Sequence, residues 1–252
     1  MPKFRLNRRK LSILLYLILG AFCGSVAGAF FALTHDLPQI RALEHFKPDA
    51  VTRIYSADKV LLAELFVEKR EPVPLETIPR HLVAALVATE DRKFYRHSGV
   101  DIKGIARAII KDIMAGEFVE GASTITQQLA KNLYLSTDKS IIRKIEELLI
   151  ALRLEKDLSK DRIFELYLNF IEWGPGIFGV EMAAEHYFKK PVGQLTLEEI
   201  VRLVAVIPQP LKINPTENSD WLNWKARWIL DALRRYAYID ESQYQTIYDR
   251  FE

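Results

Sequence analysis

The segment Leu11–Leu33 contains no charged residue, and this constrains the chain more than any other feature. A run of about 23 uncharged, mostly apolar residues forms a helix of about 35 Å, long enough to cross the hydrocarbon core of a bilayer. Several lysines and arginines precede it within residues 1–10. Because such residues stay on the cytoplasmic side, we expect a cytoplasmic basic tail at 1–10, a transmembrane helix at 11–33 and the remaining chain on the outer side of that membrane.

The alternative to an anchor is a cleaved signal peptide, in which Ala27-Gly28-Ala29 would supply the small residues of a cleavage site. The apolar stretch is too long for a signal-peptide core, so the sequence favours an uncleaved, single-pass anchor. Residues 34–50 contain Pro38 and Pro48 and are predicted to form a linker. Residues 51–252 are then predicted to form one domain.

The composition excludes several classes of protein. The 252 residues include 35 basic and 33 acidic side chains, which is not the basic excess of a nucleic-acid-binding domain. We therefore expect no nucleic-acid partner. The single cysteine, Cys23, excludes an internal disulfide. The five histidines show no metal-ligand spacing, so the residues predict no metal site.

The predicted domain is mainly α. Val51–Phe66 has two short apolar runs around a turn-like segment and predicts a small β-hairpin. The predicted helices are Pro79–Glu90, Ser123–Leu133, Ser140–Glu155, Ser159–Asn169, one opened by the capping box of Thr196 and Glu199, and a last long helix that carries Trp221, Trp224 and Trp228. The tryptophans are predicted to pack in the core or between domains rather than to form a binding platform.

Two acidic groups are candidates for catalysis. Glu90 ends a predicted helix beside a turn, with Asp91 next to it, and a carboxylate there can project into a cleft. Glu147 lies mid-helix, and Arg143 and Lys144 precede it at a spacing that puts all three on one face. Two carboxylates across a cleft suit glycosyl chemistry. The alternative is that both acids are surface residues in ordinary helix ion pairs, which contribute little.

Hydroxyl and amide side chains crowd Gly121–Asn132, where a helix is predicted to begin. Free N–H groups at a helix start favour anions, and Gln127, Gln128, Lys131 and Asn132 add donors for phosphate or sugar. The alternative is a well-capped helix with a polar surface. Composition alone does not separate these two interpretations.

In chain order, these segments resemble the signatures of the peptidoglycan glycosyltransferase family, which includes the lysozyme-like domain of class A penicillin-binding proteins and the monofunctional transglycosylases. The four matches are Glu90-Asp91-x-x-Phe94-x-x-His97-x-Gly99, Gly121–Gln128, Arg143-Lys144-x-x-Glu147, and Lys160-x-x-Ile163-x-x-x-Tyr167-Leu168-Asn169. Ala122 replaces a glycine of the second signature and is similar to the monofunctional branch. The likeness reaches Pro208 and implies a lysozyme-like, two-lobed helical domain with a small β-hairpin.

The resemblance implies that the chain polymerises lipid II. A growing glycan on undecaprenyl pyrophosphate would pass to the 4-hydroxyl of an acceptor lipid II, with inversion and release of undecaprenyl pyrophosphate. By the same resemblance, Glu90 is the general base, Glu147 organises the donor site, and Arg143 and Lys144 lie near the pyrophosphate or its metal. The other residues expected to bind substrate are Asp91, Arg107, Ser123, Thr124, Gln127, Gln128, Lys131, Asn132 and Lys139. Lys139 stands where many members carry arginine, and so lacks a bidentate fork for phosphate.

The resemblance requires no cofactor and allows a loosely bound divalent cation, Mg2+ or Mn2+. The expected partners are lipid II, the growing glycan chain, membrane lipid and other cell-wall synthesis proteins. Isoleucines at 102, 105, 109, 110 and 113 and the methionine at 114 form an apolar set. It would either dip into lipid, as the matching family region does, or pack in the core.

Three other functions compete with this interpretation. A lysozyme-like hydrolase shares the fold and cuts glycan, but it has no pyrophosphate for the basic second and third signatures to bind. A catalytically silent anchor for cell-wall assembly is disfavoured by intact Glu90 and Glu147. A transpeptidase needs three motifs, of which Ser56–Lys59 and Ser136–Lys139 match only the first. We interpret both matches as chance and expect no covalent binding of penicillin.

Overall fold

The computed structural model describes residues 8–35, 43, 52–55, 61–65, 70–116, 121, 123–134 and 140–251. These residues belong to two compact units, Met1–Gln39 and Ile40–Glu252. The boundary between the units lies within the predicted linker.

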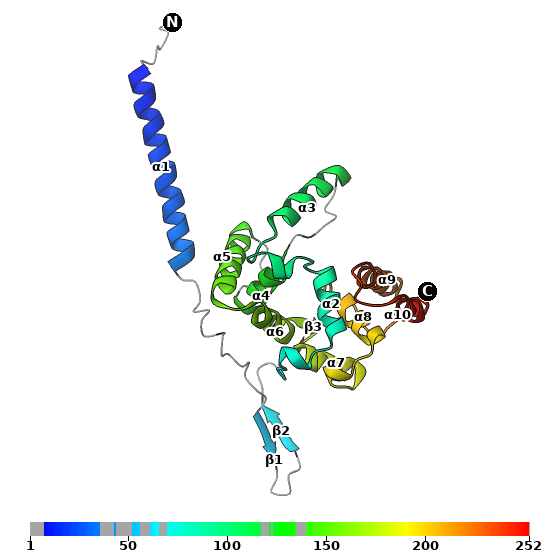
Figure 1. The fold of residues 1–252 in the computed structure, drawn as a ribbon. Helices are drawn as coiled ribbons and strands as arrows, with labels where there is room; N and C mark the ends of the chain where they lie inside the picture. The colour runs from blue at the N-terminus through cyan, green and yellow to red at the C-terminus, as the bar shows by residue number, and fades with distance from the viewer. Residues whose placement is uncertain are drawn as a thin grey trace. The chain divides into compact units, whose positions relative to one another are not determined.

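The first unit contains α1 (Arg8–His35), an uninterrupted helix of 28 residues (Figure 1). It covers the whole uncharged segment of the sequence, and its described apolar side chains, such as Leu15, Tyr16 and Phe22, are exposed. Among the residues that the structure describes, no helix was identified as long and apolar enough to cross a membrane. The α1 helix confirms the predicted helix. That this helix spans a membrane stays a prediction.

The predicted β-hairpin is confirmed. β1 (Thr52–Tyr55) pairs antiparallel with β2 (Leu61–Leu65), and Thr52 lies opposite Leu65 (Figure 1). The turn-like segment 56–59 lies outside the described residues, as does residue 60 of the predicted second strand.

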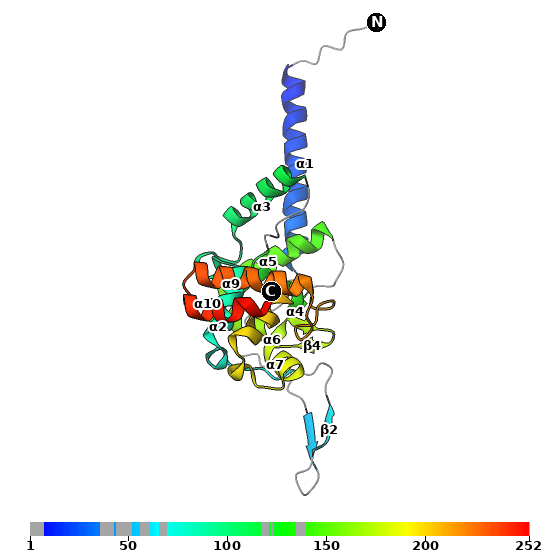
Figure 2. The same cartoon turned by 90° about the vertical axis from the view of Figure 1, so that its right-hand side faces the viewer.

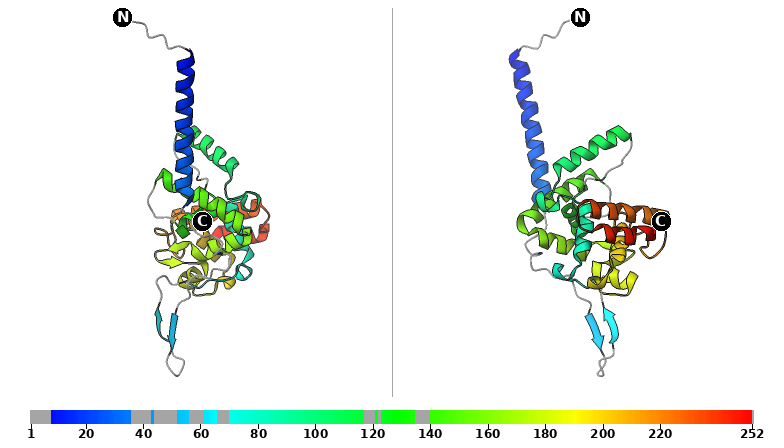
Figure 3. Two further views of the ribbon diagram at one scale, coloured as in Figure 1. Left: turned by 90° about the vertical axis from the view of Figure 1, so that its left-hand side faces the viewer. Right: turned by 45° about the vertical axis from the view of Figure 1, so that its right-hand side comes forward.

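The rest of the second unit is mainly helical, as predicted. Its α-helices are α2 (Arg80–Thr89), α3 (Ile102–Ala115), α4 (Ile125–Tyr134), α5 (Ile141–Asp157), α6 (Lys160–Phe170), α7 (Val180–Phe188), α8 (Leu197–Ala205), α9 (Asp220–Arg235) and α10 (Glu241–Tyr248), with short 3-10 turns η2 (Leu75–Thr77), η3 (Phe94–Arg96), η4 (Val192–Gln194) and η5 (Asp249–Phe251). One group of helices packs α4 against α5 and α6, and another packs α2, α8 and α9 together. α10 lies beside α9 (Figures 2 and 3).

Several helices begin where the sequence predicts a cap. The Ser140 and Ser159 hydroxyls accept hydrogen bonds from backbone N–H groups in the first turns of α5 and α6, at 3.0 and 3.2 Å. Thr196 and Glu199 form the predicted capping box of α8. Each cap satisfies an N–H group that has no partner within its own helix. Because these interactions are local, the sequence predicts them correctly.

A second hairpin was not predicted. β3 (Glu172–Gly174) pairs antiparallel with β4 (Ile177–Phe178), where the sequence indicates only a break in the chain. Strands of three and two residues are too short to show an alternating pattern. Gly176, in the turn, has φ of +71°, a conformation that costs glycine little and other residues more.

The buried side chain of Asn169 joins α6 to the extended segment that precedes α2. Its Nδ2 donates to the carbonyl oxygens of Val73 and Glu165, each at 2.9 Å, and its Oδ1 accepts from the N–H of Val73 at 2.9 Å. Asn169 is 4% exposed, so water does not replace these bonds when the side chain is removed. The asparagine of the fourth signature thus holds two distant segments together.

Four large apolar residues of α3 do not pack in the core. Ile102, Ile110, Ile113 and Met114 are between 58% and 83% exposed, and Figure 1 shows α3 projecting from the other helices of its unit. The core-packing interpretation is therefore wrong for these four residues. Insertion into lipid stays a prediction.

The tryptophans of α9 correct a second prediction. Trp224 and Trp228 are 55% and 42% exposed, so they do not pack in the core. The buried face of α9 is formed instead by Leu222, Ala226, Ile229, Leu230, Ala232 and Leu233. Residues four apart share a helix face, and the aliphatic set and the tryptophan pair occupy opposite faces. Aliphatic side chains are also buried completely more often than tryptophan.

We expect Asn169→Ala to lower the free energy of unfolding by about 2 kcal/mol, because it leaves the part-buried backbone N–H and C=O groups of Val73 without these partners. Urea denaturation followed by circular dichroism measures the change. Asn218→Ala is the matched control, since Asn218 accepts one exposed hydrogen bond from Arg202 at 3.3 Å. The control should stay within about 0.5 kcal/mol of the unmodified chain; equal losses in both variants contradict the assigned role of Asn169.

Candidate active site

A cleft of about 860 Å³ lies in the second unit. Its walls come from the turn after α2, from α3, from the residues before α4 and from α9. The residues of the sequence-predicted site that line it are Glu90, Asp91, Arg107, Ser123, Thr124 and Gln128. The first two signatures, separated in the sequence, thus form one concave surface.

Glu90 follows the last residue of α2 and is partly buried. Its Oε2 accepts a hydrogen bond from the Gln128 amide at 3.0 Å. The Gln128 carbonyl oxygen in turn accepts from the Tyr167 hydroxyl at 3.1 Å. No residue in the described part of the chain donates a hydrogen bond to Glu90 Oε1. This oxygen is therefore available to a substrate hydroxyl.

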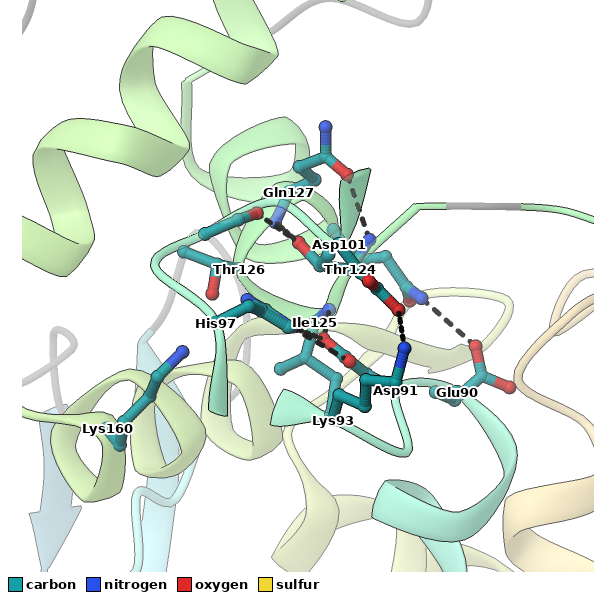
Figure 4. Close-up of polar contacts among 12 residues, drawn as sticks. Glu90, Asp91, Lys93, His97, Asp101, Thr124, Ile125, Thr126, Gln127 and Lys160 are labelled. Carbon is teal, nitrogen blue, oxygen red and sulfur yellow. Dashed lines mark hydrogen bonds and ion pairs between the residues drawn. The ribbon is translucent and has the colours of Figure 1, made fainter. Parts of the chain in front are cut away.

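Asp91 turns away from this role and holds the neighbouring backbone (Figure 4). Its two oxygens lie 3.0 and 2.9 Å from Nε2 of His97, and its Oδ2 accepts from the N–H of Ile125 at 3.1 Å. Ile125 is the first residue of α4, where a negative charge is stabilised by free N–H groups and by the helix dipole. The buried Asp91 thus fixes the start of α4 against the loop that carries Glu90.

Thr124 and Gln127 cap α4. The Gln127 Oε1 accepts from the Thr124 N–H at 2.9 Å, and the Thr124 hydroxyl accepts from the Gln127 N–H at 3.2 Å. The Thr124 hydroxyl also donates to the carbonyl oxygen of Gly99 at 2.6 Å. Both side chains are buried. The well-capped-helix interpretation therefore describes these two residues, whereas Ser123 is exposed in the cleft.

Glu147 lies on α5 and is 3% exposed. Lys144 Nζ forms an ion pair with its Oε1, and Arg143 Nη1 lies 3.8 Å from its Oε2. Lys144 Nζ also donates to the Ser123 hydroxyl at 3.0 Å. Glu147 is not among the residues that line the cleft, but the bond between Lys144 and Ser123 joins its group to the cleft wall.

Among the described residues, Arg143 is only partly paired, since its contact with Glu147 is an ion pair at 3.8 Å. Its Nε and Nη1 atoms are buried and have no hydrogen-bond partner within the described residues. Buried polar groups are normally paired, because an unpaired one costs free energy. A guanidinium in this condition is suited to an anionic ligand, and phosphate matches its geometry.

Three further residues predicted to bind substrate either do not line the cleft or are not described. Lys131 and Asn132 are exposed on α4, and neither lines the cleft. The Asn132 amide donates to the backbone carbonyl of Gln128 at 2.8 Å. Lys139 lies outside the described residues.

The sequence did not predict the wall formed by α9. Trp224, Lys225 and Trp228 line the cleft, and Lys225 Nζ lies 4.2 Å from the centroid of the Trp228 ring. Burial lowers the pKa of Lys225, and the negative charge of Glu90 opposes this effect. None of the three residues belongs to a signature. One signal in the sequence could have predicted this wall, namely the helical spacing of the leucines and isoleucines of α9. That spacing predicts that they form the buried face and that the tryptophans lie on the opposite, exposed face.

The cleft brings a partly buried carboxylate together with hydroxyl and amide donors, an arrangement that indicates an enzyme. The chain belongs to the transglycosylase family, because the family model described as "Transglycosylase" matches residues 58–234.

Similar proteins carry the same domain in longer chains. The chain is 36% identical over 250 residues to "Penicillin-binding protein 1F" of Bacillus subtilis, a match covering 98% of this chain and 34% of the relative. It is 39% identical over 234 residues to "Penicillin-binding protein 1A" of Escherichia coli, covering 91% of this chain and 28% of the relative. The chain thus spans about a third of the length of these curated relatives. A crystal structure of penicillin-binding protein 1A from Haemophilus influenzae aligns with a TM-score of 0.42 and 21% identity, over 81% of this chain and 21% of that chain. This structural similarity is too low to support any conclusion.

We expect Glu90→Gln to lower the pKa of Lys225 further, because burial then acts without the attraction of the carboxylate. At a pH near 9, more Lys225 is then neutral and it reacts faster with acetic anhydride, as measured by mass spectrometry. Glu147→Gln is the control, since Glu147 does not share the cleft wall with Lys225. If both variants change the labelling rate equally, the proximity of Lys225 to Glu90 is not the cause.

Proposed function

We propose that the chain polymerises lipid II into the glycan strands of peptidoglycan. The growing strand on undecaprenyl pyrophosphate is transferred to the 4-hydroxyl of an acceptor lipid II, the anomeric configuration inverts, and undecaprenyl pyrophosphate leaves. The observation that supports this most directly is a partly buried carboxylate, Glu90, in a large cleft whose wall is bonded through Ser123 to the Arg143, Lys144 and Glu147 group. Membership of the transglycosylase family supports the same reaction and a lysozyme-like, two-lobed fold.

Glu90 acts as the general base. The Gln128 amide holds one of its oxygens, and the other takes the proton from the acceptor hydroxyl. That hydroxyl oxygen forms a bond to the anomeric carbon while the bond between this carbon and the pyrophosphate oxygen breaks. A positioned base of this kind contributes a factor of about 10² to 10⁴ in rate.

The Arg143 and Lys144 cations stabilise the leaving group. The electron pair of the broken bond moves to the pyrophosphate, and fixed cationic donors favour this developing charge. The unpaired donors of Arg143 bind a phosphate oxygen, and Lys144 binds beside Ser123. Glu147 keeps both cations in position and does not itself react.

The Glu147 group does not fit a resident divalent cation. Its one carboxylate is already shared by two cations, whereas Mg2+ binds several oxygen ligands. Within the described residues, no three acidic, histidine or cysteine side chains form a metal-binding group. No step of this mechanism passes through a metal, and a cation that travels on the pyrophosphate belongs to the substrate.

A glycan hydrolase is the main competing function. Hydrolysis of a finished glycan releases no pyrophosphate. A hydrolase would therefore have no anionic leaving group for the buried Arg143 donors, or for Lys144 beside Ser123, to bind. These two features favour synthesis over cleavage. Incubation with lipid II separates the two functions, since only a synthase makes polymer from it.

We expect Glu90→Gln to reduce polymerisation by a factor of about 10² to 10⁴, because the amide cannot take a proton from the acceptor. Gel analysis of products from labelled lipid II, with and without the inhibitor moenomycin, measures the rate. Glu185→Gln is the matched control, because Glu185 is exposed on α7 and outside the cleft. An unaltered rate in Glu90→Gln ends the general-base mechanism.

We also propose that the chain is held in the bacterial cytoplasmic membrane with its N-terminus in the cytoplasm and its catalytic domain outside. A polyprenyl substrate stays in the bilayer, so the cleft has to open close to it. The uncharged segment Leu11–Leu33 supports an anchor. The exposed isoleucines and methionine of α3, beside Arg107 and Lys111 in the cleft wall, support a second contact with lipid.

We expect the chain to stay with membranes during extraction with alkaline carbonate. Replacing both Leu17 and Leu19 by lysine should release it, because each charge in the middle of a span costs about 2.5–3.5 kcal/mol on insertion. The control pairs Arg8→Lys with Arg9→Lys, which keep the positive charge. Immunoblots of pellet and supernatant measure the distribution; retention of the lysine variant argues against α1 as the anchor.

A further inference from the structure

We propose that Tyr167 is a positioning residue for the catalytic base, and that it orients Glu90 through the side-chain amide of Gln128. The inference rests on the proposed role of Glu90 as the base. It adds a residue that touches neither substrate nor the reacting atoms.

The contacts connect three helices. Tyr167 lies on α6 and is fully buried, and its hydroxyl donates to the Gln128 Oε1 at 3.1 Å. Gln128 lies on α4, and its Nε2 donates to Glu90 Oε2 at 3.0 Å. Glu90 lies at the end of α2. Gln128 and Glu90 line the cleft, whereas Tyr167 does not.

Tyr167 determines which way the Gln128 amide faces. Burial raises the pKa of Tyr167 well above its ordinary value, and the nearby charges of Glu90 and Asp91 act in the same direction. The hydroxyl therefore keeps its proton, and the Gln128 oxygen is its acceptor among the described residues. An amide has its acceptor and its donors on opposite sides. With the oxygen of Gln128 bound to Tyr167, its NH₂ group faces Glu90.

The opposite orientation of the Gln128 amide is unfavourable beside Glu90. If the amide turned over, the Gln128 oxygen would face the carboxylate oxygen of Glu90, and two acceptors would meet without a proton between them. Two partly buried acceptors that face each other without a donor are less stable than the hydrogen-bonded arrangement. The Tyr167 hydroxyl thus keeps Glu90 Oε2 hydrogen-bonded and leaves Oε1 for the acceptor hydroxyl.

A purely structural role for Tyr167 is the competing explanation. Its ring packs in the core, with its centroid 6.1 Å from that of Phe164. Tyr167→Phe separates the two explanations, because it keeps the ring and removes only the hydroxyl. Gln128→Met removes the amide with little change in volume.

The test is a double-mutant cycle on kcat/KM for labelled lipid II, with Tyr167→Phe, Gln128→Met and the double variant of the full chain. We expect Tyr167→Phe alone to lower kcat/KM by roughly tenfold. In the Gln128→Met background it should cause no further loss, because the amide through which it acts is absent. Losses that multiply in the double variant overturn the proposal, as does an unchanged rate in Tyr167→Phe.

A matched control and a stability measurement complete the experiment. Tyr187→Phe removes a hydroxyl that donates to the Trp173 carbonyl at 3.5 Å, outside the cleft, and should leave kcat/KM unchanged. Melting temperatures of all variants separate loss of fold from loss of positioning; a Tyr167→Phe defect that follows Tm alone overturns the proposal. The general-base test is separate from this one. If Glu90→Gln is inactive but the losses of Tyr167→Phe and Gln128→Met multiply in the double variant, only the role of Tyr167 is rejected. If Glu90→Gln is active, the role of Glu90 as the base is rejected.

Discussion

The contact between the Asp91 carboxylate and the first N–H of α4 determines how the site is built. It joins the loop after α2 to the start of α4, and the charge is buried where the helix dipole favours it. The position of Gln128 beside Glu90 follows, because both lie one turn or less from this junction. If the start of α4 moved, the Glu90–Gln128 hydrogen bond and the Ser123–Lys144 bond would be lost together.

Polar contacts behind the cleft extend this arrangement through the helices. The Thr126 hydroxyl donates to Glu155 Oε1 at 2.5 Å, and Lys160 Nζ donates to the same oxygen at 2.7 Å. The Lys160 ammonium also lies 4.3 Å from the centroid of the Phe94 ring, a distance at which cation–π attraction is appreciable. Residues of the first, second and fourth signatures therefore meet around one carboxylate of α5. These contacts bring side chains that are far apart in the sequence close together in the folded domain.

The sequence predicts what depends on local chemistry. The caps at Ser140, Ser159 and Thr196 lie within one turn of the groups they satisfy, so their residue types reveal the helix starts. Glu90 and Asp91 were identified as a pair, but their different roles depend on tertiary contacts to α4 that no local pattern contains. The exposure of Trp224 was missed for the same reason, since which face of α9 is buried depends on α2 and α8.

Residue spacing also left open how Glu90 and Glu147 lie relative to each other. Glu147 was expected to share a groove with Glu90, and the described contacts connect it to that groove only through Lys144 and Ser123. Such an indirect connection requires the packing of α4 against α5. Helical periodicity places Arg143 and Lys144 on the same face as Glu147, but it does not determine what lies opposite that face.

Two guanidinium nitrogens of Arg143 lack a hydrogen-bond partner among the described residues, and this has a thermodynamic consequence. A folded domain that buries donors without acceptors keeps a desolvation cost that disappears when an anion occupies the pocket. Anion binding and folding stability are then linked, so an anionic group bound at Arg143 would raise the free energy of unfolding.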